Sequence, residues 1–466
     1  MRSLRLLLLC PVVLAVSCSL AFDADRYRYE DDAARDAQAP TRDGGRRDGG
    51  SRDAGPLDGG SGIDGGADGG PCLTVCEDPN PVCDPSTGGC VACLIDEHCE
   101  DGDPCSVDRC GIDQMCTRAM EPTCVVQITA GGRHTCARRH SGRVDCWGEN
   151  SFGGLGDGTN TDRTGPVTTV GLFSAQEVRA GAQHTCAVRA DGAVVCWGHN
   201  LNGQLGNGSS GSGMYSTTTV NVMGITDAVE IAANRDHSCA RRATGAVLCW
   251  GSALGNGIAT DVSVATLVPG VTGAIQTTAG WGHTCVVQAA GTVQCWGLNT
   301  SGQLGNGTTT NSTTPVQVTG LEDAIEVRGG NRKTCARRAS GEVVCWGRAS
   351  AADGTSNSNV PVAVAGLTDV VEIGLGEFHA CARRSSGQVV CWGSNGDGQL
   401  GDGSTASSAV PVIVPGLTAS EVAAGFSHTC ARSVTGEVLC WGRNADGQLG
   451  DGTMENRTTP TPVGGL

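Results

Sequence analysis

One short sequence recurs seven times in the second part of this chain, and it constrains the fold more than any other feature. Its first copy, HTCARRHSGRVDCWG, runs from His134 to Gly148. Successive copies begin 50, 53, 46, 50, 46 and 49 residues apart, a period that is typical of propellers and solenoids rather than coiled coils. The later copies begin at His184, His237, His283, Lys333, His379 and His428.

Each copy predicts a β-hairpin. In the first copy, residues 136–139 and 143–147 flank a short loop ending in Gly142, which suits a three-residue turn with glycine in the left-handed conformation. Cys136 and Cys146 lie equally far from the turn, so they face each other across the strands and are close enough for a disulfide. The same spacing predicts seven intrablade disulfides: Cys136–Cys146, Cys186–Cys196, Cys239–Cys249, Cys285–Cys295, Cys335–Cys345, Cys381–Cys391 and Cys430–Cys440.

Metal binding and redox chemistry are the alternatives for these cysteines. Structural zinc sites use closely spaced cysteine pairs, and thioredoxin-like sites use C-x-x-C at a helix start. Neither spacing occurs in the repeats. We therefore interpret the pairs as structural bridges, each of which stabilises the fold by about 2–3 kcal/mol in the chain-entropy model.

The tryptophan and the histidine of the repeat each have two interpretations. The tryptophan recurs at one place per copy in a chain with only 3% aromatic residues, so we expect it to fill the core between neighbouring sheets, with ligand stacking as the alternative. The histidine follows a Gly-x-x turn, and we expect its side chain to bond to the loop backbone. A ring of metal ligands is the alternative, and we predict neither a metal nor another cofactor.

The longer repeat resembles that of a known family. The unit V-x-x-G-x-x-H-T-C-A-x-x-x-x-G-x-V-x-C-W-G-x-N-x-x-G-Q-L-G-D-G-T, followed by P-x-x-V-x-G-L, is similar to the repeat of the regulator of chromosome condensation family over residues 125–466. The resemblance implies an all-β fold, a seven-bladed β-propeller. Two copies depart from the G-Q-L-G element, at Ala253-Leu254-Gly255 and at Ala351-Ala352-Asp353-Gly354, and we expect altered loops there.

The C-terminal tail suggests how the ring closes. Residues 460–466, PTPVGGL, match the P-x-x-V-x-G-L segment that precedes each later copy, but no copy follows them. We therefore expect this tail to complete the first blade and to remove the seam between the first and last blades.

The N-terminus predicts export. Residues 1–17 combine Arg2 and Arg5 with an apolar run that is too short to span a bilayer, as in a secretory signal. The following LAVSC segment resembles a bacterial lipoprotein cleavage box, which would make Cys18 the lipidated first residue of an outer-membrane or cell-surface protein. Secretion without a lipid is the alternative.

Two further segments precede the propeller. Residues 18–71 contain Asp-Gly-Gly repeats and almost no large apolar side chains, so we predict a flexible tether rather than a calcium site. Residues 72–124 predict a small module with five disulfides of unknown connectivity, in which calcium binding by Asp101, Asp103 and Asp108 is an alternative to turn formation. Its ten cysteines are Cys72, Cys76, Cys83, Cys90, Cys93, Cys99, Cys105, Cys110, Cys116 and Cys124.

Charge and motifs exclude several classes of function. The net charge is −16, and residues 125–466 carry 21 basic and 25 acidic side chains, so we expect no nucleic-acid partner. No nucleophile elbow, metalloprotease or phosphate-binding motif stands out from the repeats, and we predict that the protein is not an enzyme. Four arginine pairs predict solvated blade edges, with a basic rim as the alternative: Arg138-Arg139, Arg241-Arg242, Arg337-Arg338 and Arg383-Arg384.

The sequence favours a monomeric, exported binding or scaffold protein, anchored to a membrane through Cys18, that presents the propeller to a protein or glycan. The alternative is a regulator or inhibitor of another protein, because the resemblance extends to a secreted β-lactamase inhibitor and to the nucleotide-exchange factor that gives the family its name. Nucleotide exchange is the weaker version, since an exported chain would not meet a small GTPase. Fold alone does not decide between these functions.

Overall fold

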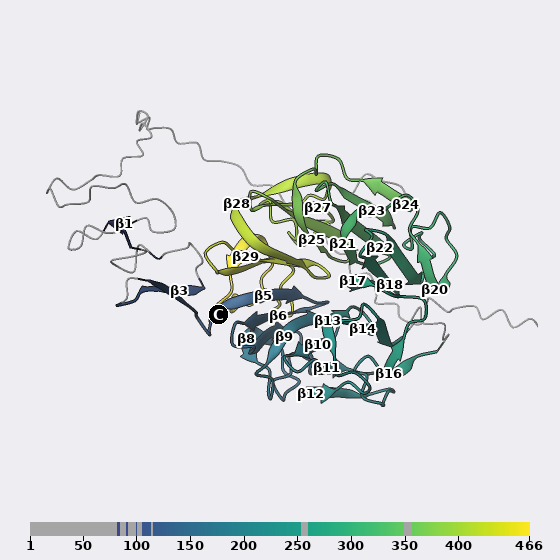
Figure 1. Ribbon diagram of the computed structural model, residues 1–466, viewed down its shortest axis with the longest axis horizontal. Coiled ribbons are helices and arrows are strands. Elements are labelled where there is room, and N and C mark those ends of the chain that lie inside the picture. Colours follow the sequence, from purple (N-terminus) through teal and green to yellow (C-terminus); the bar gives the residue numbers. More distant parts are fainter. Residues whose placement is uncertain are drawn as a thin grey trace, which may run out of the picture. The chain divides into compact units, whose positions relative to one another are not determined.

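The computed structural model describes residues 105–112, 115–252, 260–348 and 357–466, together with residues 82–83, 90–91 and Cys99. In these residues the secondary structure consists of β-strands joined by turns and loops (Figure 1). The chain divides into two units, Met1–Asp68 and Gly69–Leu466. The expected signal peptide, Cys18 and almost all of the tether belong to the first unit and lie outside the described residues.

Each sequence copy forms the two central strands of an antiparallel sheet, and one further strand pairs on either side. The first five copies form separate four-stranded sheets. Their strands are β5 (Val125–Ala130), β6 (His134–Arg139), β7 (Val144–Gly148) and β8 (Arg163–Thr168); β9 (Ala175–Ala180), β10 (His184–Arg189), β11 (Val194–His199) and β12 (Tyr215–Asn221); β13 (Ala228–Ala233), β14 (His237–Arg242), β15 (Val247–Gly251) and β16 (Val262–Leu267); β17 (Ala274–Ala279), β18 (His283–Gln288), β19 (Val293–Gly297) and β20 (Ser312–Gln317); and β21 (Ala324–Gly329), β22 (Lys333–Arg338), β23 (Val343–Gly347) and β24 (Ser358–Ala363).

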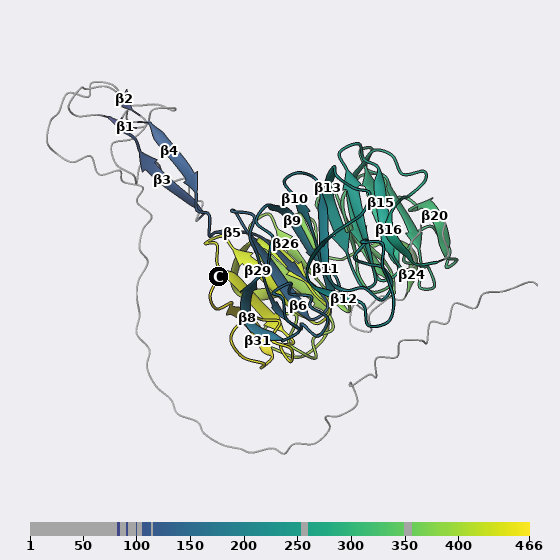
Figure 2. The same cartoon turned by 90° about the horizontal axis from the view of Figure 1, so that it is seen from below.

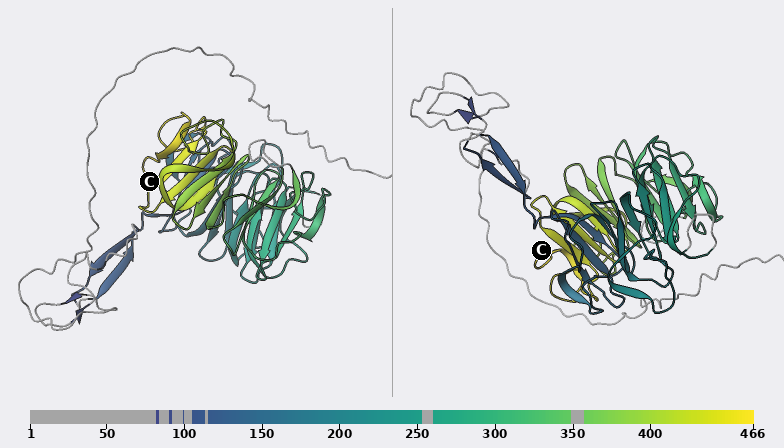
Figure 3. Two further views of the ribbon diagram at one scale, coloured as in Figure 1. Left: turned by 90° about the horizontal axis from the view of Figure 1, so that it is seen from above. Right: turned by 60° about the horizontal axis from the view of Figure 1, so that its bottom comes forward.

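The last two copies share one long strand. β28 pairs with β27 through its first half and with β29 through its second half, so that two four-strand units join into a seven-stranded sheet. Consecutive sheets lie side by side in both views of Figure 3. The strands of this sheet are β25 (Val370–Leu375), β26 (His379–Arg384), β27 (Gln388–Gly393), β28 (Ser408–Ala424), β29 (His428–Ser433), β30 (Val438–Gly442) and β31 (Arg457–Pro462).

The register of the central hairpins confirms the predicted disulfides. Cys136 lies directly opposite Cys146, and the Cα atoms of the seven predicted pairs are 4.0–4.1 Å apart. The turn glycine Gly142 has a φ of 80°, which is the left-handed conformation that the turn requires. All seven bridges are buried or nearly so.

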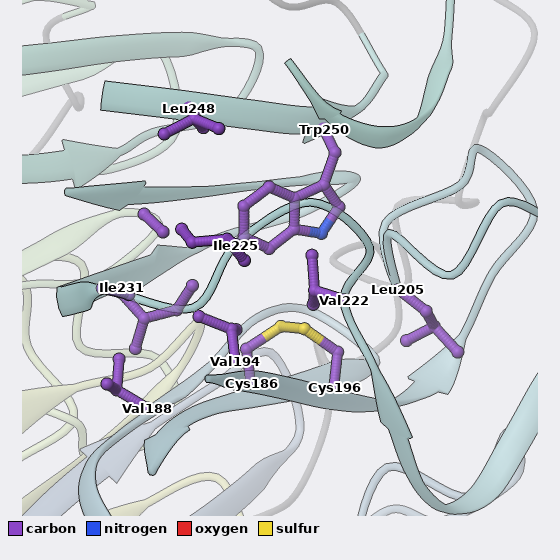
Figure 4. Close-up of a cluster of buried hydrophobic side chains, with 12 residues drawn as sticks. Cys186, Val188, Val194, Cys196, Leu205, Val222, Ile225, Ile231, Leu248 and Trp250 are labelled. Atoms are coloured by element: carbon purple, nitrogen blue, oxygen red, sulfur yellow. A yellow bond between two sulfur atoms is a disulfide. The ribbon is translucent and has the colours of Figure 1, made fainter. Parts of the chain in front are cut away.

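Each disulfide packs against the tryptophan of the next repeat. Figure 4 shows the Cys186–Cys196 bridge below Trp250, with Val194 and Val222 between the two sheets. The same arrangement occurs at every interface, and at the last one the Cys430–Cys440 bridge contacts Trp147 of the first repeat. The tryptophans therefore fill the core between sheets, as predicted, and the copies form a closed ring with the propeller architecture.

The expected role of the C-terminal tail is wrong. β31 pairs with β30 of its own repeat, and the outer strand of the first sheet is β8. The reason is that the P-x-x-V-x-G-L segment follows the copy to which it belongs, and the first copy has its own at residues 166–172, PVTTVGL. The tail still contributes to closure, because Val463 and Leu466 pack in the cluster that holds Trp147. β5 accordingly lies beside the sheet of β29 in Figures 1 and 2.

The disulfide-rich module is described only in part. Strands β1 (Val82–Cys83) and β2 (Cys90–Val91) pair with each other, as do β3 (Ser106–Cys110) and β4 (Cys116–Met120). Two of the expected bridges are Cys99–Cys116 and Cys105–Cys124, and Cys110 is also disulfide-bonded. The pairing of the remaining module cysteines lies outside the described residues.

Replacing Cys239 by serine is expected to destabilise the propeller by about 2–3 kcal/mol, because the denatured chain regains the loop-closure entropy that the bridge removes. Thermal unfolding measures the loss. A thiol assay in denaturant should find Cys249 as one new free thiol, which is buried in the folded protein. An unchanged melting temperature, with several thiols already free in the parent protein, would contradict the disulfide assignment.

Candidate functional site

A ring of polar contacts joins the repeats. The buried histidine that opens each central hairpin places Nε2 2.8–3.0 Å from a hydroxyl of the next repeat. The expected partner in the histidine's own loop is therefore corrected to one in the neighbouring sheet. The pairs are His134–Thr185, His184–Ser238, His237–Thr284, His283–Thr334, His379–Thr429 and His428–Thr135.

These hydroxyls determine the protonation of the histidines. Thr185 donates its proton to the carbonyl of Gly154, 2.9 Å away, so Nε2 of His134 must carry the proton that Thr185 accepts. The indole of Trp197 donates to the same carbonyl at 2.8 Å. Equivalent carbonyls at Gln204, Gln303, Gln399 and Gln448 each accept a hydroxyl and an indole proton.

Burial keeps the histidines neutral. It lowers the pKa of all six ring histidines from 6.5 to about 3 or 4. Their Nε2 atoms are used between repeats and are therefore not available as metal ligands. Within the described residues, no group of three or more His, Cys, Asp or Glu side chains could hold a metal ion.

The polar ring is interrupted between the fifth and sixth repeats. Lys333 occupies the histidine position, and the residue that should supply the hydroxyl is Ala380. Both partners of the interaction are replaced at the same interface. This double replacement is physically reasonable, because a buried hydroxyl or imidazole left without its partner would cost about 1–3 kcal/mol.

Restoring the pair should stabilise the protein. We expect the unfolding free energy of the double variant Lys333→His with Ala380→Thr to exceed the value predicted by adding the effects of the two single substitutions. The expected difference is about 1 kcal/mol, the net value of one hydrogen bond. A double-mutant cycle in urea measures this coupling. The reciprocal control, His134→Lys with Thr185→Ala, should also lose less stability than the sum of its single changes. Additive effects in both cycles would show that the hydrogen bond contributes nothing.

The histidines should make the propeller sensitive to acid. The pKa of His134 is about 4 in the folded protein and 6.5 for an ordinary histidine, as expected in the unfolded chain. Between these two pH values the unfolded chain therefore binds more protons than the folded protein. The stability contributed by neutral His134 is fully present above pH 6.5 and is lost as the pH falls toward 4. His134→Gln should reduce the slope of unfolding free energy against pH by about 1.4 kcal/mol per pH unit in this window. Urea unfolding of both proteins between about pH 6.5 and 4.5 tests this, and equal slopes would contradict it.

A second ring surrounds the central channel. The third residue of six innermost strands is Glu or Gln, and Glu421 holds the equivalent position in the second half of β28. The side-chain oxygen of each accepts a backbone N–H from the next repeat at 2.7–3.3 Å. Glu421 closes this ring by accepting the N–H of Ile128. Burial, and then the nearby charge of Glu372, raise the pKa of Glu421 to about 7. The ring members are Gln127, Glu177, Glu230, Gln276, Glu326, Glu372 and Glu421.

The paired arginines do not form a basic rim. The first arginine of each pair bonds to the ring around the channel, as Arg337 does to Glu326 at 2.9 Å. The second bonds to an aspartate or glutamate elsewhere, as Arg338 does to Asp323 at 2.9 Å. The other three pairs follow the same rule. Seven of these eight arginines therefore pair with a carboxylate, and Arg138 donates to the amide oxygen of Gln127.

The channel opens onto the face where the central hairpins begin. The channel cavity of about 220 Å³ is lined by the innermost strands of all repeats and by the loops before the histidines. We use the term loop rim for three positions in each repeat. They are the two residues before the His or Lys that opens the central hairpin and the residue after C-W-G. Backbone bonds connect these positions, such as Arg348 N to Arg332 O at 2.7 Å.

The residues of the loop rim differ from repeat to repeat. On the channel side it is lined by Trp281, Asn331, Glu377 and Phe426 from one half of the ring, but by Gly132 in the first repeat. Trp281 is half-buried, and the guanidinium of Arg235 lies 3.9 Å from its ring centroid. Burial raises the pKa of Glu377, which accepts a hydrogen bond from Asn331 at 2.8 Å.

Trp281 was not predicted from the sequence. The available signal was that seven of the eight tryptophans belong to C-W-G, whereas Trp281 stands in a turn that is otherwise variable. The departures at residues 253–255 and 351–354 lie outside the described residues. No helix in the described residues is long and apolar enough to cross a membrane.

The comparisons with known proteins agree with this fold. Models of the regulator of chromosome condensation (RCC1) repeat match residues 125–153, 176–204, 228–254, 274–303, 370–399 and 419–448, and residues 141–188, 290–337, 386–432 and 435–466. Together these matches cover more than half of the chain. No curated protein matches the sequence.

Solved structures are similar in fold. Human WBSCR16 is 22% identical with a TM-score of 0.62, and the match covers 69% of this chain and 94% of that one. Yeast RCC1 (Prp20), in a structure bound to Kap60, is 20% identical with a TM-score of 0.62 over 73% of this chain and 85% of that one. A further structure of Prp20p from Saccharomyces cerevisiae, described together with its binding to Gsp1p and histones, matches equally well in TM-score.

Proposed function

Because this chain belongs to the family of regulator of chromosome condensation repeat proteins, we propose that it is an exported, lipid-anchored surface protein that binds a protein partner through its loop rim. The fold is that of a protein-interaction or regulatory scaffold. One yeast neighbour, Prp20p, is described as binding Gsp1p and histones. For this chain we propose only that it binds another protein, and not that it binds the partners of Prp20p.

The variation at the loop rim carries the proposal. Elsewhere the repeated side chains are used to build the ring: cystine against tryptophan, histidine against hydroxyl, and glutamate against backbone N–H. At the rim the same positions hold Trp281, Phe378, Phe426 and several arginines. Tryptophan and arginine are enriched among the residues that dominate protein interfaces.

The cysteines support export. The described bridges pair all fourteen propeller cysteines, and disulfides persist mainly in oxidising compartments. The lipid anchor rests on the N-terminal sequence, where a signal segment is followed by Cys18. In this proposal, the Asp- and Gly-rich residues 18–71 would serve as the tether between the membrane and the propeller.

We also propose that the protein acts by binding rather than by catalysis. The groups whose pKa values are shifted most are the six histidines and Glu421. They belong to interactions that recur around the ring. Regulation or inhibition of the partner would use the same surface, and the identity of the partner distinguishes that role from adhesion.

A capture experiment tests the binding surface. The full mature chain, immobilised without reductant, should retain a stoichiometric protein from the envelope or medium of the producing cell. Trp281→Ala should weaken this binding by at least about 2 kcal/mol, as expected for a central interface tryptophan. The control Phe173→Ala changes a side chain that is 72% exposed beside the hairpin turns of the opposite face.

The outcomes separate the alternatives. Loss of capture by Phe173→Ala but not by Trp281→Ala would move the interface to the hairpin-turn face. If no protein is captured, the proposal of a protein partner fails and glycan binding becomes the better hypothesis. Capture of an enzyme with a change in its activity would assign the regulatory role.

A further inference from the structure

The fifth repeat departs from the others at its rim. It has Lys333 where six repeats have histidine, and Arg332 and Arg348 at two rim positions. Arg332 has a φ of 52°, whereas every other described residue with positive φ is glycine. Such a backbone conformation is unfavourable for a long side chain and is found preferentially at functional sites.

Arg332 and Arg348 differ from the arginines that hold the fold together. In the same repeat, Arg337 and Arg338 lie 2.9 Å from the carboxylates of Glu326 and Asp323. Arg332 and Arg348 have no ion pair within 4.0 Å in the described part of the chain, and Nε of Arg332 is buried without an acceptor there. The terminal nitrogens of these two guanidinium groups therefore remain available as donors, whereas the buried Nε of Arg332 is not accessible to an external ligand.

Two aromatic rings flank these arginines. The guanidinium of Arg332 lies 5.9 Å from the ring centroid of Trp281, and that of Arg348 lies 5.7 Å from that of Phe378. Contact with a ring face orients a guanidinium, while its N–H edge remains available to an acceptor. Two such edges suit carboxylates, which arginine binds through paired hydrogen bonds.

We propose that Trp281, Arg332, Arg348 and Phe378 form a basic–aromatic patch that binds a carboxylate-bearing segment of the protein partner. This inference rests on the proposed function, since it specifies the chemistry of the partner at the loop rim. Charge supports it: among the rim residues, five arginines face three carboxylates, in a chain whose net charge is −16. The patch itself contributes the two guanidinium charges of Arg332 and Arg348, which Glu377, next to Phe378 in the chain, opposes in part.

A peptide fits this patch better than a nucleic acid. A nucleic acid presents many regularly spaced phosphates and rewards an extended basic surface. At the loop rim, the excess of basic over acidic side chains is confined to a few residues. Residues 125–466 as a whole carry more acidic than basic groups. A short acidic segment with an adjacent apolar side chain matches both the guanidinium groups and the rings.

The test measures fluorescence anisotropy of a labelled hexaglutamate peptide with the full chain, at about 0.05 M and about 0.3 M salt. A hexaglutamine peptide of equal length is the neutral control. The protein should bind hexaglutamate, more weakly at high salt, and should not bind hexaglutamine. The double variant Arg332→Gly with Arg348→Gln should lower the affinity by about tenfold or more, since it removes two charge-assisted contacts.

The choice of variants protects the test against misfolding. Glycine at position 332 suits the positive φ, so this change removes the guanidinium and relieves backbone strain. The matched control Arg242→Gln removes an arginine that pairs with Asp227 near a hairpin turn. It should leave peptide binding unchanged.

Three results would overturn the proposal: equal affinity of the double variant and the parent, equal binding of hexaglutamine, or tighter binding of a thymidine oligonucleotide than of hexaglutamate. A partner captured through Trp281 but unaffected by the double variant would overturn the carboxylate inference and leave the proposed function intact. Failure of all capture would instead overturn the proposed function.

Discussion

The structure depends on the packing of each disulfide against the tryptophan of the next repeat. A single four-stranded sheet of this size buries little apolar surface on its own, and it exposes one side of its cystine. The next repeat covers that side with the largest side chain of the motif, as Trp250 covers the Cys186–Cys196 bridge. Because Trp147 does the same for the last repeat, every sheet is completed only when the ring is closed.

Buried polar groups, like the cystines, are completed by contacts from the neighbouring repeat. The carbonyl of Gln204 lies in one repeat, yet it accepts protons from Trp250 and Ser238 of the next. Glu230 likewise accepts a backbone N–H from Thr277 in the following sheet. Buried polar groups must be paired, and here their partners belong to neighbours. This requirement explains why the repeated residues vary so little and leave the rim free to vary.

Function is therefore expected where the structural requirement is weakest. Trp281 lies at a turn position that other repeats fill with residues as different as Gly132 and Phe426, and Arg332 adopts an unfavourable backbone conformation in the equivalent turn of the next repeat. The side chain of neither residue takes part in the repeated contacts between sheets, whereas the backbone N–H of Trp281 donates to the carbonyl of Gly330 in the next repeat, as the equivalent residues of other repeats do. Their proximity brings aromatic and cationic groups of two repeats to one side of the channel opening.

Much of this fold could be predicted from local spacing. The hairpin, its turn glycine and the opposed Cys136 and Cys146 follow from residues close in sequence, because strand alternation and turn geometry are local properties. The core position of the tryptophan also followed, since few other large side chains were available. Its repetition, with the resemblance to a known family, was enough to indicate a propeller.

Contacts between repeats were decided only by the tertiary structure. The role of His134 depends on Thr185, and the paired loss at Lys333 and Ala380 is meaningful only once the two residues are known to be opposite each other. The tail was assigned to the wrong sheet because the same motif both follows one copy and precedes the next. The sequence by itself determined the hairpin, its disulfide and the repeat; the structure determined which repeat each polar group contacts, because those partners lie about one repeat apart in the chain.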